Sequence, residues 1–214
     1  MADDPKTVSA DAVLRWLQNS AETFEQHKDE LTQLDAAIGD ADHGANMARG
    51  FNAVSGKLAE LKGKDIGTVF KTVAMTLIST VGGASGPLYG TLFLQSVSGA
   101  NGKSELTHQE LYSVLSSGLH GLMNRGKAAV GEKTMVDALV PALDALKPQG
   151  EDTLTAGIDR AVAAAKEGAD STIPLVAKKG RSSYLGERSA GHLDPGAASS
   201  VMLLEALQKA VRPA

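Results

Sequence analysis

The chain has 214 residues, a formal net charge of −4 and no cysteine, with 43% hydrophobic and 4% aromatic residues. This length suits a single domain over residues 1–214 whose core needs no disulfides. The weakly acidic balance gives no electrostatic reason to bind nucleic acid or an anionic membrane surface. No apolar run approaches the roughly 20 residues of a membrane-spanning helix, and residues 1–6 lack signal-peptide features, so we expect a cytoplasmic protein.

In chain order, the first predicted elements are helices. Apolar residues at a spacing of three and four predict helices over 13–17 and 47–61. Asp65 is placed to cap a third helix, which runs into a glycine-rich stretch at 82–86. Pro87 then stands in the first turn of a fourth helix, where proline is well tolerated.

The second half of the chain repeats this pattern. Thr107-His108-Gln109-Glu110 is a capping box before regularly spaced leucines. Another helix opens near Thr134 and ends before Pro148, an apolar stripe marks a helix over 154–165, and Asp194-Pro195 opens the last one. The count is about eight helices. No alternating strand pattern and no repeat recurs, so we predict an all-α fold rather than a doubly wound α/β sheet.

One segment, 172–191, has no helical pattern. It contains a proline, three glycines and a local excess of basic side chains, which are Lys178, Lys179, Arg181 and Arg188. A loop of this length in a compact domain is usually functional or disordered. Arg181 is the candidate for contacting a phosphoryl group, because a guanidinium can donate two parallel hydrogen bonds to it. The alternative is a solvated basic patch, or one that meets an acidic partner.

An acidic cluster dominates the first third of the chain. Asp35, Asp40 and Asp42 fall within eight residues, beside Gly39 and His43. Three neighbouring carboxylates repel one another unless a cation lies between them. Their oxygen ligands favour Mg²⁺, Ca²⁺ or Mn²⁺, although the histidine keeps zinc open.

The cluster has two other interpretations. An EF-hand loop beginning at Asp40 would need a glycine and a glutamate where Ala45 and Phe51 stand, so this reading is rejected. A magnesium ion that keeps waters and is completed by substrate phosphates fits better. Alternatively, Asp40 or Asp42 merely caps the helix that begins near Gly44.

The stretch Gly82-Gly83-Ala84-Ser85-Gly86-Pro87 places small residues directly before a helix. Their backbone N–H groups can approach an anion, and the helix start adds partial positive charge. It is not a Walker A motif, because no Lys-Ser/Thr pair follows. A tight turn between helices would also need small residues here. Thr134, taken alone, reads as a helix N-cap.

Five motifs in this order resemble the nucleotide-binding L subunit of dihydroxyacetone kinases, through essentially the whole chain. The motifs are Asp35 followed by Gly39-Asp40-Ala41-Asp42-His43-Gly44, then Gly82-Gly83-Ala84-Ser85-Gly86-Pro87, Gly131-Glu132-Lys133-Thr134-Met135, the segment from Lys179-Gly180-Arg181 to Gly186-Glu187-Arg188, and Gly191-His192-Leu193-Asp194-Pro195-Gly196.

The resemblance implies eight antiparallel helices in a closed α-barrel, with the nucleotide at one end. It implies that Asp35, Asp40 and Asp42 ligate two Mg²⁺ ions and that Arg181 is catalytic. It further implies that ADP or ATP is bound by His43, Gly44, Ala45, Asn46, Ala84, Ser85, Gly126, Thr134, Met135, Arg181, Asp194, Pro195 and Gly196. A role for His43 as a phosphoryl carrier is less favoured, because acidic neighbours are a poor setting for a phosphorylated imidazole.

The resemblance also implies partners. A K subunit would hold dihydroxyacetone, and a phosphocarrier M subunit fed by the phosphotransferase system would rephosphorylate bound ADP in place. The chain has no segment for a substrate-binding lobe and, at 214 residues, is not expected to be a fused single-chain kinase. Two alternatives stay open, which are the nucleotide subunit of an ATP-exchanging kinase for another substrate and a nucleotide-state regulatory module.

Overall fold

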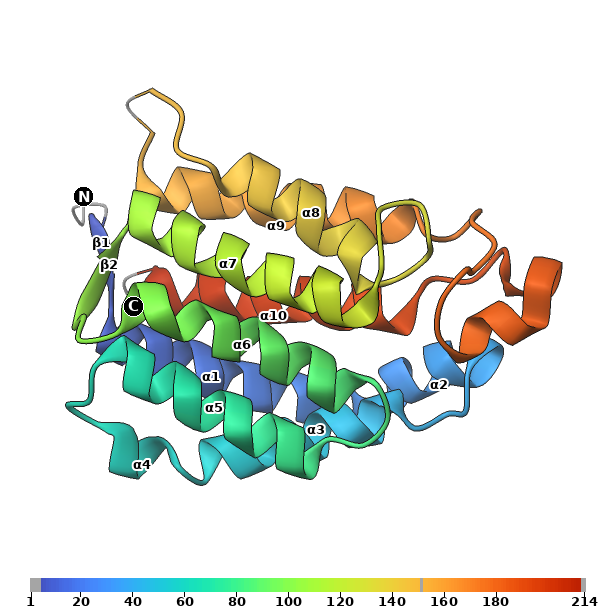
Figure 1. Cartoon of the computed structure of the whole chain (residues 1–214), viewed down its shortest axis with the longest axis horizontal. Coiled ribbons are helices and arrows are strands. Elements are labelled where there is room, and N and C mark those ends of the chain that lie inside the picture. The colour runs from blue at the N-terminus through green and yellow to red at the C-terminus, as the bar shows by residue number, and fades with distance from the viewer. Residues whose placement is uncertain (1–4, 151, 213–214) are drawn as a thin grey trace.

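The computed structural model describes residues 5–150 and 152–212. Within these ranges the chain forms ten α-helices, one 3₁₀ helix and a two-stranded sheet (Figure 1). The helices are α1 (Ala10–Gln26), α2 (Lys28–Ile38), α3 (His43–Ser55), α4 (Leu58–Leu61), α5 (Ile66–Thr80), α6 (Ser85–Ala100), α7 (His108–Gly126), α8 (Met135–Leu146), α9 (Leu154–Asp170), η1 (Arg181–Ser189, 3₁₀) and α10 (Pro195–Val211), and the strands are β1 (Thr7–Ser9) and β2 (Glu105–Thr107).

The predicted, predominantly helical fold is confirmed, with additions that the sequence pattern did not reveal. β1 and β2 pair antiparallel, with Val8 opposite Leu106, and three residues are too few to show an alternating pattern. The helix predicted over 47–61 is interrupted after Ser55, so α4 is separate. In α2 the buried face includes Asp35, and this carboxylate hides the apolar period of the helix.

Each predicted helix start that depended on a capping side chain is confirmed. Asp65, Thr107, Thr134 and Asp194 all accept a hydrogen bond from a backbone N–H group in the first turn of their helices. The loop predicted over 172–191 is only partly a loop, because η1 forms within it and is kinked at Gly186, which has a φ of 55°.

The long helices pack in an order that places each next to its neighbours. α3 packs on α1 and α5, α6 lies between α5 and α7, α8 packs on α7, and both α8 and α9 pack on α10, which returns to α1. Figure 1 shows the small sheet at one end of this bundle and α2 with η1 at the opposite end. No helix of the described ranges combines the length and the apolar character needed to cross a membrane.

The core includes an aromatic cluster from α1, α5 and α6. Trp16 of α1 is 1% exposed and packs on Phe70 and Phe93, with ring centroids 6.2 and 5.7 Å away. Its indole N–H donates to the Leu203 carbonyl of α10 at 2.8 Å. A buried indole needs such a partner, so this contact helps to fix α10, whose first turn reaches the site described below.

Candidate functional site

A cavity of about 370 Å³ lies at the end of the bundle that carries α2 and η1. Four helices begin at its wall, because the lining includes the first residue of α3, α6, α8 and α10. These residues are His43, Ser85, Met135 and Pro195. Helix N-termini carry partial positive charge and free N–H groups, so their convergence makes the cavity suited to an anionic ligand.

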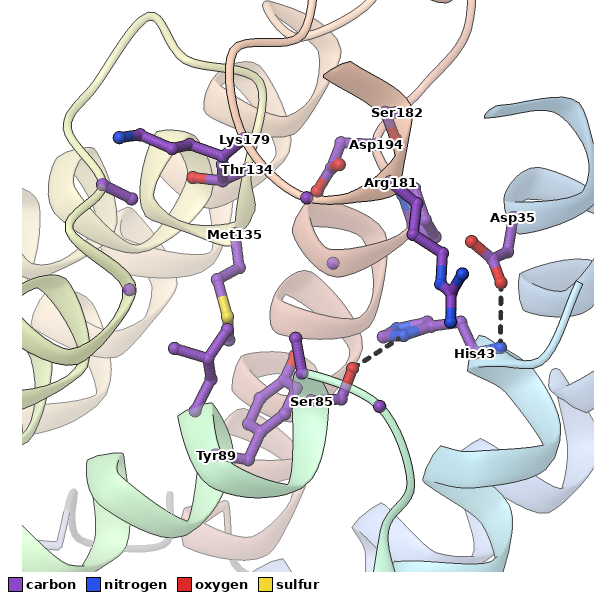
Figure 2. Close-up of a pocket in the computed structure, with 18 of the residues that line it drawn as sticks. Asp35, His43, Ser85, Tyr89, Thr134, Met135, Lys179, Arg181, Ser182 and Asp194 are labelled. Atoms are coloured by element: carbon purple, nitrogen blue, oxygen red, sulfur yellow. Dashed lines mark hydrogen bonds between the residues drawn. The ribbon is translucent and has the colours of Figure 1, made fainter. Parts of the chain in front are cut away.

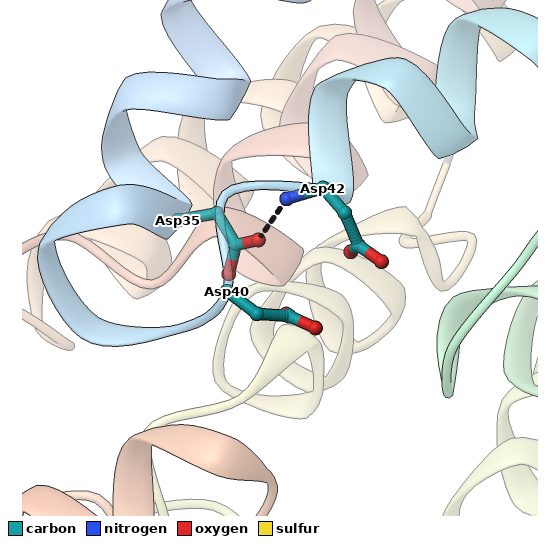
Figure 3. A group of neighbouring side chains, drawn as sticks. All are labelled: Asp35, Asp40 and Asp42. Carbon is teal, nitrogen blue, oxygen red and sulfur yellow. Dashed lines mark hydrogen bonds between the residues drawn. The ribbon is translucent and has the colours of Figure 1, made fainter.

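The three predicted metal ligands meet on one side of this cavity (Figure 3). One carboxylate oxygen from each of Asp35, Asp40 and Asp42 lies within 4.8 Å of the other two. Asp35 projects from α2 and is buried, whereas Asp40 and Asp42 stand on the exposed turn between α2 and α3. An all-oxygen, partly exposed donor set fits a hard divalent cation that keeps waters and shares phosphate oxygens.

Asp35 also organises the start of α3. Its Oδ2 accepts hydrogen bonds from the backbone N–H groups of Asp42 and His43, at 2.9 and 3.1 Å (Figure 3 shows the first). Asp42 occupies the N-cap position, but its side chain makes no capping bond. The cap that the sequence suggested for Asp40 or Asp42 therefore comes from the preceding helix. Gly39 is required here, because a Cβ at this position would lie 2.0 Å from Asp35 Oδ1.

His43 is buried and bonded at both ring nitrogens. Its Nδ1 lies 3.1 Å from the Ser85 hydroxyl, and its Nε2 lies 2.9 Å from the Ser199 hydroxyl (Figure 2). Burial lowers the pKa of His43, against the smaller raising effects of Asp35 and the neighbouring Asp42, so the imidazole is neutral near pH 7. With both nitrogens engaged by hydroxyls, the ring is placed to orient Ser85 and offers no free nitrogen to carry a phosphoryl group.

A hydroxyl network behind His43 was missed by the sequence reasoning. Tyr89 Oη lies 2.7 Å from Ser199 Oγ and 3.1 Å from Ser200 Oγ, and both serines donate to the Gly196 carbonyl. Burial raises the pKa of Tyr89 to about 12, so it stays a neutral hydroxyl. The available signal was Tyr89 one helical turn after Ser85, and a pair of serines directly before the apolar run 201–204 of the last helix.

The glycine-rich stretch 82–86 forms the tight turn between α5 and α6 and also lines the cavity. A Cβ on Gly86 would lie 2.3 Å from the Val81 carbonyl, so the tight turn itself needs this glycine, whereas a Cβ on Gly82 would lie 2.9 Å from Asn46 Oδ1 of α3. Gly83 has a φ of 63°, which favours glycine. Ala84 and Ser85 follow and line the cavity, as does the turn before them.

Three residues predicted to bind the nucleotide, Gly44, Ala45 and Asn46, lie in the first turn of α3 and are not part of the cavity lining. Gly44 is pressed against α2, where a Cβ would lie 2.0 Å from the Lys28 carbonyl. Asn46 is buried behind Gly82. The geometry gives Gly44 and Asn46 a role in shaping the site, and their contact with a nucleotide stays a prediction.

Gly44→Ala is therefore expected to destabilise the fold by about 3 kcal/mol or more, because a backbone contact cannot yield as a flexible side chain would. Gly56→Ala is the matched control, since its Cβ would meet nothing closer than 3.7 Å and its φ of −60° suits alanine. Urea unfolding of both variants without nucleotide measures the difference. A Gly44→Ala variant as stable as the control would show that this glycine is not required for packing.

The wall opposite the carboxylates is largely apolar. It contains Gly126 at the end of α7, Met135 and Val136 at the start of α8, and Leu88 of α6. Figure 2 shows the Met135 side chain on the far side of the cavity from Asp35. Thr134 caps α8 beside them. An apolar wall with a polarisable sulfur suits an aromatic ring, so the cavity offers carboxylates on one side and an apolar surface on the other.

The remaining predicted residues, Asp194, Pro195, Gly196 and Arg181, also reach the cavity. Asp194 is buried at the start of α10, and this burial raises its pKa to about 7. Arg181 reaches across from η1, and its Nε lies 2.9 Å from Asp40 Oδ2. The basic segment therefore does not form a separate surface patch at this residue. It brings a guanidinium to the carboxylate cluster, as Figure 2 also shows.

Several known proteins are similar to this chain in sequence. The DAK2 domain model matches residues 37–209. The chain is 43% identical over 208 residues to the PEP-dependent dihydroxyacetone kinase, ADP-binding subunit DhaL, of Escherichia coli (strain K12), covering 96% of this chain and 99% of that protein. It is 47% identical over 203 residues to the ADP-binding subunit DhaL of PEP-dependent dihydroxyacetone kinase 1 of Listeria innocua serovar 6a, covering 94% and 96%.

A solved structure is similar along nearly the whole chain. The dihydroxyacetone kinase from C. freundii in complex with AMP-PNP and Mg²⁺ superposes with a TM-score of 0.71 at 26% identity. The match covers 98% of this chain and 36% of that larger protein.

Proposed function

The chain belongs to the DAK2 domain family, and from this premise we propose that it is the ADP-binding subunit of a phosphoenolpyruvate-dependent dihydroxyacetone kinase. The observation that carries the proposal is the cavity itself, in which three carboxylates face the starts of four helices. Carboxylates and helix N-termini attract opposite charges, and a metal-bound phosphate chain satisfies both at once. High identity over nearly the full length of the DhaL relatives supports the same assignment.

Asp35, Asp40 and Asp42 would hold magnesium, and we propose two Mg²⁺ ions. The donor set fits, because it consists of carboxylate oxygens that converge beside a cavity large enough for phosphates. When bound, magnesium neutralises phosphate charge and orients the transferring group. Asp35 contributes further by fixing the start of α3 through its two backbone hydrogen bonds.

The polar and apolar parts of the cavity would bind different parts of the nucleotide. Ser85, held by neutral His43, and the backbone of Gly83 and Ala84 would contact the phosphates. The ring would lie against Met135 and Gly126 on the apolar wall, with Thr134 nearby. The Asp194-Pro195-Gly196 turn would border the adenosine part, because it lines the cavity at the start of α10.

Arg181 is the residue we propose as catalytic. A guanidinium can stabilise the charge that spreads over a phosphoryl group during transfer, and it needs no proton exchange to do so. The segment that carries Arg181 places it beside the carboxylate cluster, at the charged end of the cavity. Positioning and charge neutralisation are the main demands of phosphoryl transfer, and the chain supplies both.

The acceptor and the phosphoryl donor would come from partners. We propose that a K subunit presents dihydroxyacetone and that a phosphocarrier M subunit rephosphorylates ADP in place, which makes the chain active only in their presence. A cytoplasmic location follows from these partners. The cyclic packing order from α1 through α10 supports a closed α-barrel, and one hydrophobic cluster from Val8 to Val211 supports a single domain over 1–214.

The decisive experiment is to purify the chain without added nucleotide, denature it and identify any released small molecule by chromatography and mass. Stoichiometric ADP is the expected result. Transfer from phosphoenolpyruvate to dihydroxyacetone should then require both partner subunits. An empty protein that binds ATP weakly and reversibly would favour an ATP-exchanging kinase for another substrate. No transfer with any partner would favour a nucleotide-state regulatory module.

A further inference from the structure

The segment that carries Arg181 is closed at its base. The backbone N–H of Gly191 donates to the Ile173 carbonyl at 2.7 Å, and that of Asp194 donates to the Thr172 hydroxyl at 3.0 Å. The two ends of the segment 172–192 therefore meet beside the start of α10, while η1 projects beyond the bundle (Figure 1). In a compact loop whose ends are joined, the contacts between the two ends determine where the remaining residues lie. We call these contacts the base of the segment.

A buried lysine from another part of the chain holds both ends of this base. Lys133, in the loop between α7 and α8, is 1% exposed. Its ammonium group donates to the Thr172 carbonyl at 2.6 Å and to the His192 carbonyl. One charged group thus bonds to the first and the last residue of the segment. Hydrogen bonds from a charged donor to buried carbonyls are among the stronger ones in proteins.

The backbone at Lys133 shows that this placement is imposed by its surroundings. Its φ of 62° lies in the left-handed region, which residues other than glycine adopt only where neighbouring structure fixes them. The adjacent Glu132 carbonyl accepts from the Lys178 backbone N–H at 3.1 Å. Two consecutive residues before α8 therefore hold the segment at its base and along its near side.

The charge of Lys133 is balanced in the interior. Burial lowers the pKa of Lys133, and the buried carboxylates of Asp194 and Asp137 oppose this effect in part. A buried ammonium with carbonyl acceptors and nearby carboxylates can remain charged. The sequence singles out Lys133 only as part of the 131–135 motif. Lys133 is among the residues that line the cavity, and its ammonium group bonds to both ends of the segment 172–192.

Arg181 cannot be fixed by packing around its own side chain, because that side chain is 68% exposed. We propose that Lys133 is a positioning residue for phosphoryl transfer, which holds both ends of the segment 172–192 and thereby places the Arg181 guanidinium at the Asp40 carboxylate. The effect of Lys133 on the rate of transfer rests on the proposed kinase function. Its effect on the position of the segment 172–192 does not depend on that function.

The test is a double-mutant cycle of Lys133→Met and Arg181→Ala, with Lys147→Met as the control for loss of an exposed lysine at the far end of α8. Lys133→Met keeps the aliphatic volume and removes both hydrogen bonds. We expect it to lower kcat about 10- to 100-fold, because small displacements of a catalytic group have effects of this size. In the Arg181→Ala background the same change should alter kcat by less than about twofold, because Lys133 then has nothing to position.

Amide hydrogen exchange of residues 173–191 gives a reading that does not depend on catalysis. Lys133→Met should speed exchange at Ala177 and Gly191 more than about tenfold while the α1 and α5 amides keep their rates. Unchanged exchange in the segment would overturn the proposal even if the wild type proved inactive as a kinase. If the loss of kcat in the double variant equals the product of the two single losses, Lys133 and Arg181 act independently, and this result would also overturn the proposal. Lys133→Arg, which keeps donors and charge, carries the same measurements if Lys133→Met fails to fold, with a smaller expected effect.

Discussion

Asp40→Ala is expected to abolish magnesium-dependent nucleotide retention, with the Kd for Mg-ADP raised about 100-fold or more. Asp40 offers one of three carboxylates that converge within 4.8 Å, and the remaining pair cannot balance the charge of a cation and its phosphates in the same way. The fold should survive, because Asp40 is exposed on the turn between α2 and α3. Isothermal titration with Mg-ADP, and with ADP in the presence of a chelator, measures the effect.

Two further variants make this experiment specific. Asp29→Ala removes an exposed carboxylate from the first turn of α2 and should leave the Kd within about twofold of the wild type. Asp42→Ala should match Asp40→Ala, because its side chain makes no capping bond that would complicate the result. If magnesium still strengthens ADP binding equally in all three variants, the metal lies elsewhere and the carboxylate cluster has another purpose.

Arg181→Ala is expected to lower the rate of phosphoryl transfer about 10³- to 10⁵-fold, the range over which arginines at a transferring phosphoryl group contribute. Nucleotide retention should change less than about tenfold, since the helix starts and the carboxylates remain. Stability should be nearly unaffected, because an ion pair as exposed as Arg181 with Asp40 contributes little to folding. Single-turnover transfer with both partner subunits separates the chemical step from binding.

Arg188→Ala is the matched control for this variant. It removes an exposed guanidinium from the same 3₁₀ helix, at the end away from Asp40, and should retain the wild-type rate within about twofold. Equal losses in the two variants would indicate that the basic segment acts through its summed charge, for instance by attracting an acidic partner. A normal rate for Arg181→Ala would remove it from the catalytic machinery.

Under the proposed function, the site would bind phosphate in a helical protein without a Walker A loop. Four helices begin at one cavity, so their partial charges add where a sheet-based protein uses a single helix and a lysine. His43 orients the Ser85 hydroxyl without adding positive charge, because burial lowers the pKa of its imidazole and keeps it neutral. If the cavity binds a nucleotide as we propose, the carboxylates would admit its phosphates only together with a cation, so nucleotide binding would depend on metal.

Local sequence signals were sufficient for four helix starts and for the presence of the acidic cluster. Asp65, Thr107, Thr134 and Asp194 each cap the helix that was predicted from them, because a capping side chain bonds to backbone atoms within its own turn. The acidic cluster was visible for the same reason, since its carboxylates are neighbours in the chain. The small sheet and α2 were missed, because three-residue strands have no period and the buried face of α2 contains Asp35.

Tertiary structure alone decided how these residues act together. Contacts between separate helices decide three features of the site. Asp35 caps α3, Gly44 packs on α2, and Tyr89 and Ser199 lie behind His43. The strongest case is Lys133, which bonds to residues 39 and 59 positions further along the chain. Helix propensity and capping are local, and a sequence displays them directly. The alignment of four helix starts around one cavity is a result of packing, which no stretch of the sequence contains by itself.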